Sequence, residues 1–310
     1  TTGRQKMTPA SVTCNTSPLA AKHYADAACF SPAAVIENVR TARDTYRMRI
    51  ATPAIAERIL PGQFIMVRLA GATDPMLGRA FAVYDVVRGE EGTAEALDFV
   101  YLKKGNLTTP LSACLPGATV EAWGPLGNGF QLPATDHLIM VAGGIGQTPF
   151  LALGKQYLGA DFYGDCDPAD QPHPRRATLC YGVRTAELLA GEADFRGAGI
   201  DLRVASDDGS VGHHGLVTEL LERALDEPAE QPHVACCGPE PMMQAVAEVC
   251  ARRGVGCQVS LETPMACGIG ICFSCVARVR QEEGPGGEPR WDYKRTCVDG
   301  PVFDAQQIVW

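Results

Sequence analysis

The chain has 310 residues, of which 46% are hydrophobic and 20% charged, a composition typical of a globular protein with more than one domain. Its formal net charge of −9 disfavours nucleic acid and anionic membrane surfaces as partners. No apolar run approaches the roughly 20 residues that span a bilayer, and the 13 cysteines lack the framework of a secreted disulfide protein. We therefore expect a cytoplasmic protein with reduced thiols and no membrane span.

Two regions precede the first strand–helix alternation. Hydrophobic residues in 1–33 follow neither a helical nor a strand periodicity, and we expect an N-terminal extension there. Residues 34–133 contain short β-runs separated by turns, at 35–39, 46–50, 63–69, 81–87, 97–102 and 119–123. Six short strands punctuated by Gly and Pro predict an antiparallel β-barrel domain.

Residues 134–254 alternate strand and helix patterns, which predicts an α/β domain with a parallel sheet. A buried strand at 137–142 is followed by three glycines: Gly143, Gly144 and Gly146. Glycines allow a backbone to approach a pyrophosphate at a helix N-terminus, although a plain strand–helix connection also uses them. The turn after the strand 233–237 repeats the arrangement at Cys237 and Gly238. Because open α/β sheets bind ligands at the carboxyl ends of their strands, the two turns together favour a nucleotide site.

Residues 255–310 contain four cysteines with an informative spacing: Cys267, Cys272, Cys275 and Cys297. Three close thiolates and one distant thiolate are typical of plant-type [2Fe–2S] centres. Gly268 and Gly270 tolerate the dihedral angles of a loop that wraps a cluster. A four-cysteine zinc site is the alternative, but zinc sites are usually built from two close pairs. The spacing therefore predicts a small iron–sulfur domain in a multidomain protein of mixed β and α/β class.

The order of barrel, nucleotide domain and cluster segment resembles the ferredoxin–NADP reductase superfamily. Within it, the chain is most similar to the electron-transfer subunits of two-component dihydroorotate dehydrogenases. The motifs that carry the resemblance are MACGIGICFSC at 265–275, TCVDGPVF at 296–303, GPLGNGF at 124–130 and SDDGS at 206–210. The family's flavin strand usually begins Arg-Pro with a later Ser or Thr, whereas this chain has Arg79-Ala-Phe-Ala82.

The resemblance implies three cofactors, FAD, a [2Fe–2S] cluster and NAD(H), and a role for Cys237 beside the nicotinamide during catalysis. It assigns the pyrophosphate and nicotinamide turns to Gly143, Gly144, Gly146 and Gly238. It assigns the flavin to Arg79, Ala80, Phe81, Ala82, Tyr101, Gly105 and Thr108. The implied activity is electron transfer in pyrimidine biosynthesis, in a hetero-oligomer with a catalytic subunit that oxidises dihydroorotate.

Other functions remain open from the sequence. The same modules occur in NAD(P)H-dependent reductase subunits of cytosolic hydrogenases and of oxygenase systems, and a redox sensor could keep the cluster without turning over nucleotide. Arg184 could meet the 2′-phosphate of NADP or be a solvated residue at a helix start. The apolar residues Pro301, Val302, Phe303, Ile308, Val309 and Trp310 could form part of a partner-binding face or pack under the cluster loop.

Overall fold

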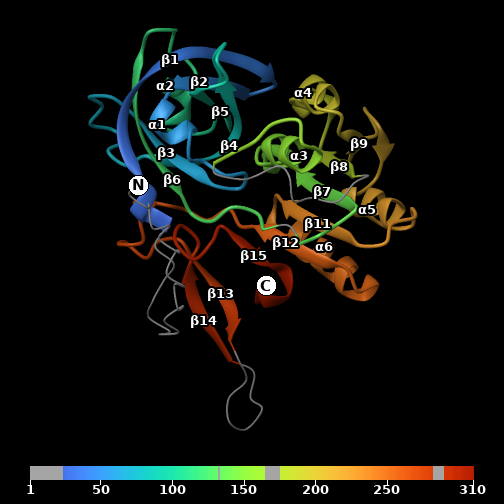
Figure 1. The fold of residues 1–310 in the computed structure, drawn as a ribbon. Helices are drawn as coiled ribbons and strands as arrows, with labels where there is room; N and C mark the ends of the chain where they lie inside the picture. The colour runs from blue at the N-terminus through green and yellow to red at the C-terminus, as the bar shows by residue number, and fades with distance from the viewer. Residues whose placement is uncertain (1–23, 132, 165–174, 282–289) are drawn as a thin grey trace, which may run out of the picture.

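The computed structural model describes residues 24–131, 133–164, 175–281 and 290–310. Figure 1 shows a β-barrel and an α/β sheet side by side, with a small hairpin below both. Most of the expected N-terminal extension, residues 1–23, lies outside the described residues. None of the described helices is long and apolar enough to cross a membrane.

The first domain is a closed barrel in which every strand pairing is antiparallel and the strand order is β1-β2-β5-β4-β3-β6. Its strands are β1 (Cys29–Ala42), β2 (Thr45–Ala51), β3 (Phe64–Leu69), β4 (Arg79–Arg88), β5 (Ala94–Leu102) and β6 (Thr119–Leu126). The short helices α1 (Pro53–Ala56) and α2 (Thr108–Leu111) fill the connections. Alternate residues such as Phe81, Val83 and Phe99 point inward and form the barrel core, as the period of a strand requires. The prediction of a six-stranded barrel is confirmed.

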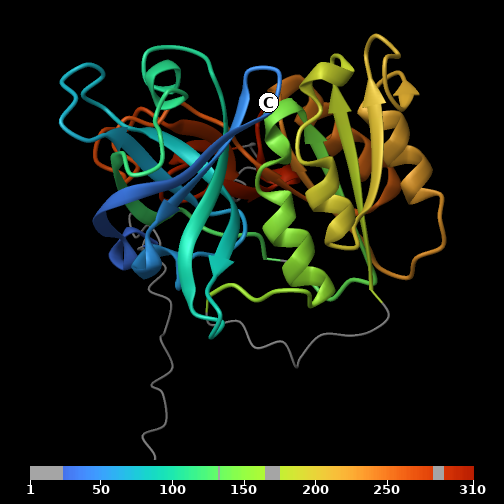
Figure 2. The same cartoon turned by 90° about the horizontal axis from the view of Figure 1, so that it is seen from above.

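The second domain is a seven-stranded sheet of order β10-β9-β8-β7-β11-β12-β15, parallel except for the last strand. Its strands are β7 (His137–Gly143), β8 (Arg176–Val183), β9 (Asp201–Ser206), β10 (His213–His214), β11 (Pro232–Cys237), β12 (Gly256–Ser260) and β15 (Val302–Asp304). Helices α3 (Phe150–Leu158), α4 (Glu192–Gly197), α5 (Val217–Leu225) and α6 (Glu240–Arg253) cover the sheet, as Figure 2 shows from above. The predicted parallel sheet is confirmed.

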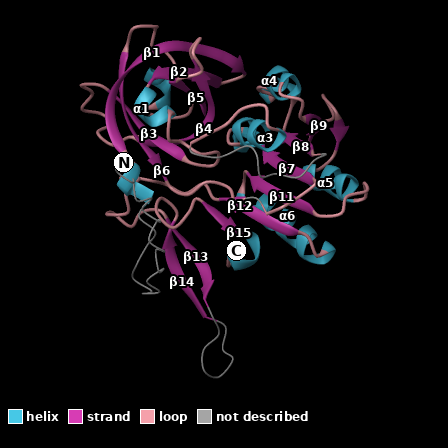
Figure 3. Cartoon of the chain, in the orientation of Figure 1, coloured by secondary structure: helices cyan, strands magenta, loops and turns pink. Residues whose placement is uncertain are grey.

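The C-terminal segment contributes to two structures. Its hairpin, β13 (Val276–Gln281) and β14 (Arg290–Arg295), stands apart from the large sheet in Figure 3. Its last strand, β15, instead pairs antiparallel with β12 and continues the nucleotide sheet. The cluster segment is thereby fastened to the second domain at one end, while the loop before β13 reaches toward the barrel.

Candidate functional site

The cysteine loop lies between β12 and β13 and is shaped by two glycines. Gly268 (φ +75°) and Gly270 (φ +82°) adopt the left-handed conformation that L side chains rarely take. A Cβ on Gly268 would meet the Met66 side chain at 2.7 Å, and one on Gly270 would meet Val298 at 2.5 Å. The two glycines therefore allow the loop to turn and also let its backbone pack closely against Met66 and Val298.

The four cysteine side chains come together in two pairs. Hydrogen bonds with Ser274 and then with Cys267 lower the pKa of Cys272 to about 6. A hydrogen bond with Cys297 lowers the pKa of Cys275 to about 6, and the same contact raises that of Cys297. Among the described residues, no group of three or more His, Cys, Asp or Glu side chains could hold one metal ion. Two thiols for each of two irons is the donor set that a [2Fe–2S] cluster requires, so the residues present fit that group.

Neighbouring side chains hold the loop in place through its carbonyl groups. Arg295 Nη1 donates to the Gly270 carbonyl at 2.9 Å, and Thr296 Oγ1 donates to the Cys275 carbonyl at 3.0 Å. The hydroxyl of Ser274 lies 3.2 Å from Cys272 Sγ and accepts from the Ala266 N–H at 3.2 Å. Such outer contacts fix the orientation of ligand side chains before any metal binds.

The cluster loop packs directly on the outside of the barrel. Phe64, Met66 and Leu126 form one buried core with Cys275, Cys297 and Val298, and Ala80 and Trp123 pack against it. The indole Nε1 of Trp123 donates to the Cys267 carbonyl at 3.1 Å. Trp123 and Met66 could not be predicted as neighbours of the cysteines, because they lie in strands far from the cysteine motif in the sequence. Their alternation in β6 and β3 marks them only as outward-facing apolar residues.

The expected flavin strand shows a clean division of its two faces. In β4, Phe81 points into the barrel core, while Ala80 and Ala82 face outward and are half-buried. Ala80 lies opposite Met66 in the neighbouring strand, which brings it close to the cluster loop. Arg79 is exposed, and its guanidinium donates to the carbonyl of Gly78 at 3.0 Å. Small outward side chains leave backbone surface free, which fits a flat flavin ring.

The other expected flavin residues differ in accessibility. Tyr101 is only 1% exposed and lies inside the barrel core, where its hydroxyl donates to Asn38 at 2.9 Å. Burial raises the pKa of this phenol. Thr108 is the first residue of α2, and its hydroxyl accepts a hydrogen bond from the Lys104 N–H at 2.7 Å. Gly105 (φ +103°) has no atom within 4 Å of a Cβ position, so its backbone stays open to a ligand. Tyr101 therefore supports the barrel from within, whereas Gly105 offers an accessible surface.

The two glycine turns of the sheet meet at the ends of β7 and β11. A Cβ on Gly146 would lie 2.3 Å from the Cys237 carbonyl oxygen, and one on Gly143 would meet Met242 at 2.6 Å. Gly238 (φ +153°) lies against the backbone of Gly143, where a Cβ would be 2.9 Å from the Gly143 nitrogen. Side chains are thus excluded from this junction, while a Cβ on Gly144 would find no atom within 4 Å.

Buried groups at this junction show what chemistry it can support. Burial raises the pKa of Cys237 well above its usual value, the negative field of Glu262 adds to the effect, and Ser260 opposes it with a hydrogen bond. The thiol is therefore neutral at physiological pH. Gln147, which follows Gly146, is fully buried, and neither amide atom has a hydrogen-bond partner in the described part of the chain. An unpaired amide beside a glycine turn fits a site that binds a polar cofactor.

Most of the apolar C-terminal residues do not form an exposed face. Pro301, Val302, Phe303 and Ile308 are buried, and β15 holds two of them in the sheet. The hypothesis that they bind a partner is wrong for these four residues, because their side chains are buried; for the half-buried Val309 and Trp310 it stays a prediction. The cluster loop instead exposes three apolar side chains: Ile269 (40% exposed), and Ile271 (74%) and Phe273 (63%) on either side of Cys272.

Comparison with known proteins assigns each region to a family. Three family models match: an oxidoreductase FAD-binding domain at residues 32–131, an oxidoreductase NAD-binding domain at 140–248, and the iron-sulfur cluster binding domain of dihydroorotate dehydrogenase B at 262–309. The chain thus has domains for binding FAD, NAD and an iron–sulfur cluster.

Similar whole proteins show the same organisation. The dihydroorotate dehydrogenase B (NAD(+)) electron transfer subunit of Caldanaerobacter subterraneus subsp. tengcongensis is 34% identical over 278 residues, covering 90% of this chain and 98% of that protein. The subunit of the same name from Geobacillus kaustophilus is 35% identical over 272 residues, covering 86% and 94%. A solved chain of NADH-dependent reduced ferredoxin–NADP oxidoreductase superposes with a TM-score of 0.72 at 26% identity, with 90% of each chain covered. Phthalate dioxygenase reductase shares the fold, with a TM-score of 0.56, 17% identity and 87% and 94% of the chains covered. The chain belongs to the family of electron transfer subunits of dihydroorotate dehydrogenase B.

Proposed function

We propose that this chain transfers electrons between a catalytic subunit that oxidises dihydroorotate and NAD+, as a step of pyrimidine biosynthesis. The observation that carries the proposal is the continuous packing from the flavin strand to the cluster loop. Ala80 lies opposite Met66, and Met66 in turn contacts the loop at Gly268. The relatives described above carry the name of the same electron transfer subunit, which supports the proposal. We place the protein in the cytoplasm, as part of a hetero-oligomer.

The proposed site residues fall into three groups. The cluster ligands are Cys267, Cys272, Cys275 and Cys297. The flavin residues are Arg79, Ala80, Phe81, Ala82, Tyr101, Gly105 and Thr108. The nucleotide residues are Gly143, Gly144, Gly146 and Gly238, with Cys237 beside the reacting ring. The proposed domains are 34–133 for FAD, 134–254 for NAD and 255–310 for the cluster, with β12 and β15 joining the last domain to the nucleotide sheet. They follow a proposed extension over 1–33, whose last residues, from Cys29 on, belong to the barrel strand β1.

The chain's own residues provide alignment rather than acid–base chemistry. When bound, FAD exchanges a hydride with NAD(H) and single electrons with an iron–sulfur cluster. The contact between Gly146 and Cys237 fixes the two nucleotide turns relative to each other. The neutral thiol of Cys237 adds no charge beside the proposed position of the nicotinamide ring. On the other side, Trp123 anchors the first cluster ligand to the barrel.

A reconstitution experiment tests this function. The chain, purified without oxygen, should contain FAD, iron and acid-labile sulfide, and should reduce ferricyanide with NADH. It should not oxidise dihydroorotate alone, and NADH should form from dihydroorotate and NAD+ only after the catalytic subunit is added. Zinc in place of iron and sulfide, FMN as the sole released flavin, or dihydroorotate oxidation by the isolated chain would contradict the proposal.

We further propose NAD(H) rather than NADP(H) as the nucleotide. Arg184 is exposed at the end of β8, and the adjacent loop after β9 brings two exposed carboxylates, Asp207 and Asp208, beside it. Backbone hydrogen bonds hold the two segments together: Asp207 N donates to Val183 O at 3.1 Å, and Asp208 N donates to Arg184 O at 3.3 Å. These carboxylates offset the cation and repel a 2′-phosphate. The ratio of kcat/KM for NADH and NADPH with ferricyanide tests this preference, and equal values would contradict it.

A further inference from the structure

The hairpin β13–β14 carries arginines and aromatic rings on one face. In an antiparallel pair, directly opposite residues share a face, and Arg278 lies opposite Tyr293 while Arg280 lies opposite Trp291. Arg295 follows on the same side of β14, and its guanidinium carbon lies 5.0 Å from the centre of the Phe273 ring in the cluster loop. We define these six residues as the arginine–aromatic face: Phe273, Arg278, Arg280, Trp291, Tyr293 and Arg295.

Contacts within this face connect its members from the hairpin to the cluster loop. The rings of Trp291 and Tyr293 meet edge to face, with centroids 5.2 Å apart, and Arg278 lies 6.0 Å from the centre of the Trp291 ring. The rings remain largely uncovered, since Trp291 is 49% exposed and Tyr293 56% exposed. Tyrosine, tryptophan and arginine are the residues that contribute most to binding energy in protein interfaces. A contiguous exposed surface of this composition indicates a protein-binding site.

The charge of the face is opposite to that of the whole chain. Its three guanidinium groups stand in a protein of net charge −9. Arg295 is 3.7 Å from Asp299, while Arg278 donates to the Trp310 carbonyl at 3.3 Å. Within the described ranges, neither Arg278 nor Arg280 has a carboxylate within 4.0 Å. A local cationic surface on an acidic protein selects a partner whose contact surface is acidic, and it orients that partner as it approaches.

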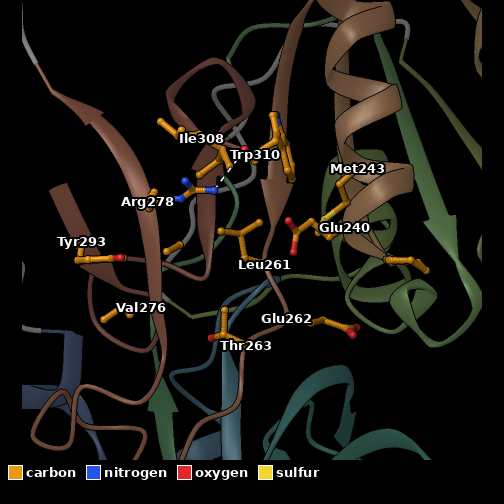
Figure 4. A pocket seen from close by; sticks show the side chains of 14 residues that line it. Glu240, Met243, Leu261, Glu262, Thr263, Val276, Arg278, Tyr293, Ile308 and Trp310 are labelled. Atoms are coloured by element: carbon orange, nitrogen blue, oxygen red, sulfur yellow. Dashed lines mark hydrogen bonds between the residues drawn. The ribbon is translucent and has the colours of Figure 1, made fainter. Parts of the chain in front are cut away.

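A cavity of about 300 Å³ borders the face. Figure 4 shows the side chains that line it. Arg278 and Tyr293 form one wall, and helix α6 forms the other with Glu240 and Met243. Leu261, Ile308 and Trp310 supply apolar lining between the walls. Gly238, Glu262 and Thr263 also line the cavity, so its lining is mixed and it extends from the face toward the proposed nucleotide turn.

The face ends where electrons must cross between subunits. Phe273 follows Cys272, which is itself exposed, and Ile271 on its other side is 74% exposed. A protein docked on the hairpin would therefore cover the exposed edge of the cluster site and exclude water from it.

We propose that the arginine–aromatic face docks an acidic surface of the catalytic subunit. This inference rests on the proposed function, because it takes the partner from it. It goes further by assigning the hairpin, rather than the cluster loop alone, as the main binding element.

Charge reversal on the two faces of one strand pair tests the proposal. Arg280→Glu changes the arginine–aromatic face, and Arg290→Glu makes the same change on the opposite face of the hairpin, one residue from Trp291. Each variant, purified with its FAD and iron–sulfur cluster, is titrated with the catalytic subunit from the same organism, and binding is measured by isothermal titration calorimetry. We expect Arg280→Glu and Trp291→Ala to weaken binding at least tenfold, and Arg290→Glu to change it less than about threefold. The effect of Arg280→Glu should shrink as ionic strength rises from about 0.01 M to about 1 M, where the screening length falls to about 3 Å.

Visible absorption and NADH–ferricyanide activity serve as internal controls and should be unchanged in all three variants. Equal binding by Arg280→Glu and Arg290→Glu would overturn the docking inference while leaving the function intact, since the wild type still binds. Failure of the wild type to bind the catalytic subunit would instead contradict the proposed function. The inference would also be overturned if the face served another partner. This would be the case if the wild type self-associated or bound single-stranded DNA and Arg280→Glu abolished that interaction.

Discussion

The cluster loop and the glycine turns of the nucleotide sheet are both shaped by glycines, but they form their sites by different means. In the proposed cluster site, three thiols of the loop and Cys297 supply the binding chemistry, and Gly268 and Gly270 only turn the chain. At the proposed nucleotide site, at the ends of β7 and β11, the surface is backbone, and the essential feature is the absence of side chains at Gly146 and Gly238. Loss of one side chain should therefore abolish the first site, whereas addition of one should damage the second.

The largest effect is expected from Cys272→Ser. This exposed thiol is one of the four proposed ligands, and its loss would leave one iron without its pair of thiolates. We expect the cluster absorption and most of the iron to be lost, with FAD content and NADH–ferricyanide activity retained. Cys114→Ser, which changes a partly buried thiol outside the motif, is the control and should keep all four properties. Retention of the cluster in Cys272→Ser would remove this residue from the ligand set.

A methyl group added at Gly146 tests the second half of the comparison. Its Cβ would lie 2.3 Å from the Cys237 carbonyl oxygen, so the two turns must separate. We expect Gly146→Ala to lower NADH–ferricyanide activity at least tenfold and to reduce the free energy of unfolding by about 1–3 kcal/mol, with the cluster spectrum unchanged. Gly197→Ala in α4, where a Cβ meets no atom within 4 Å, should leave both quantities unchanged or slightly higher. Normal activity in Gly146→Ala would show that the turns need not touch.

Acid should weaken the nucleotide sheet through His137, which lies at the opposite end of β7 from the glycine turn. The ring is 1% exposed, Arg176 donates to its Nδ1 at 2.8 Å, and Nε2 donates to Thr178 Oγ1 at 2.9 Å. Burial and the charge of Arg176 lower the pKa of His137 from 6.5 to about 4. The unfolded chain then binds the proton more readily than the native state. The contribution of the neutral His137 to the free energy of unfolding is therefore complete above pH 6.5 and is lost as the pH falls toward 4.

Urea unfolding between pH 7 and pH 4.5 measures this effect, which we expect to be on the order of 1–3 kcal/mol. His137→Gln should flatten the pH dependence in this range. His214→Gln, at an exposed position, should retain the slope of the wild type. If the free energy of unfolding of His137→Gln depends on pH as strongly as that of the wild type, His137 is not the source of this pH dependence.

The smallest effect is expected at the contact between barrel and cluster loop. Trp123→Phe keeps an aromatic ring but removes the hydrogen bond to the Cys267 carbonyl. We expect a loss of about 1 kcal/mol in the free energy of unfolding, together with a shifted midpoint potential and EPR spectrum of the reduced cluster. Trp291→Phe, on the hairpin, should leave the potential unchanged. If the potential of Trp123→Phe equals that of the wild type, the hydrogen bond does not tune the cluster.

Much of the architecture was predictable because its signals are local. The alternation of apolar residues in β4 and β5 identifies barrel strands, and the strand–glycine–helix order identifies the parallel sheet. The resemblance placed the flavin on β4, but the pattern could not show that Tyr101 points into the core, away from the surface around Gly105. Nor could it show that Phe303 is buried in an added strand rather than exposed to a partner.

The sequence by itself predicted the four cluster ligands, because the chemistry of a cysteine and the close spacing of Cys267, Cys272 and Cys275, with Cys297 further along, can be read directly from the chain. The tertiary structure alone decided which residues surround those ligands. Trp123 and Cys267 are separated by 144 positions, and Asn128 meets Val302 across 174, so no local period could pair them. Such contacts form when the barrel, the sheet edge and the C-terminal segment bury their apolar surfaces together. Their positions therefore follow from packing over the whole molecule rather than from any one stretch of sequence.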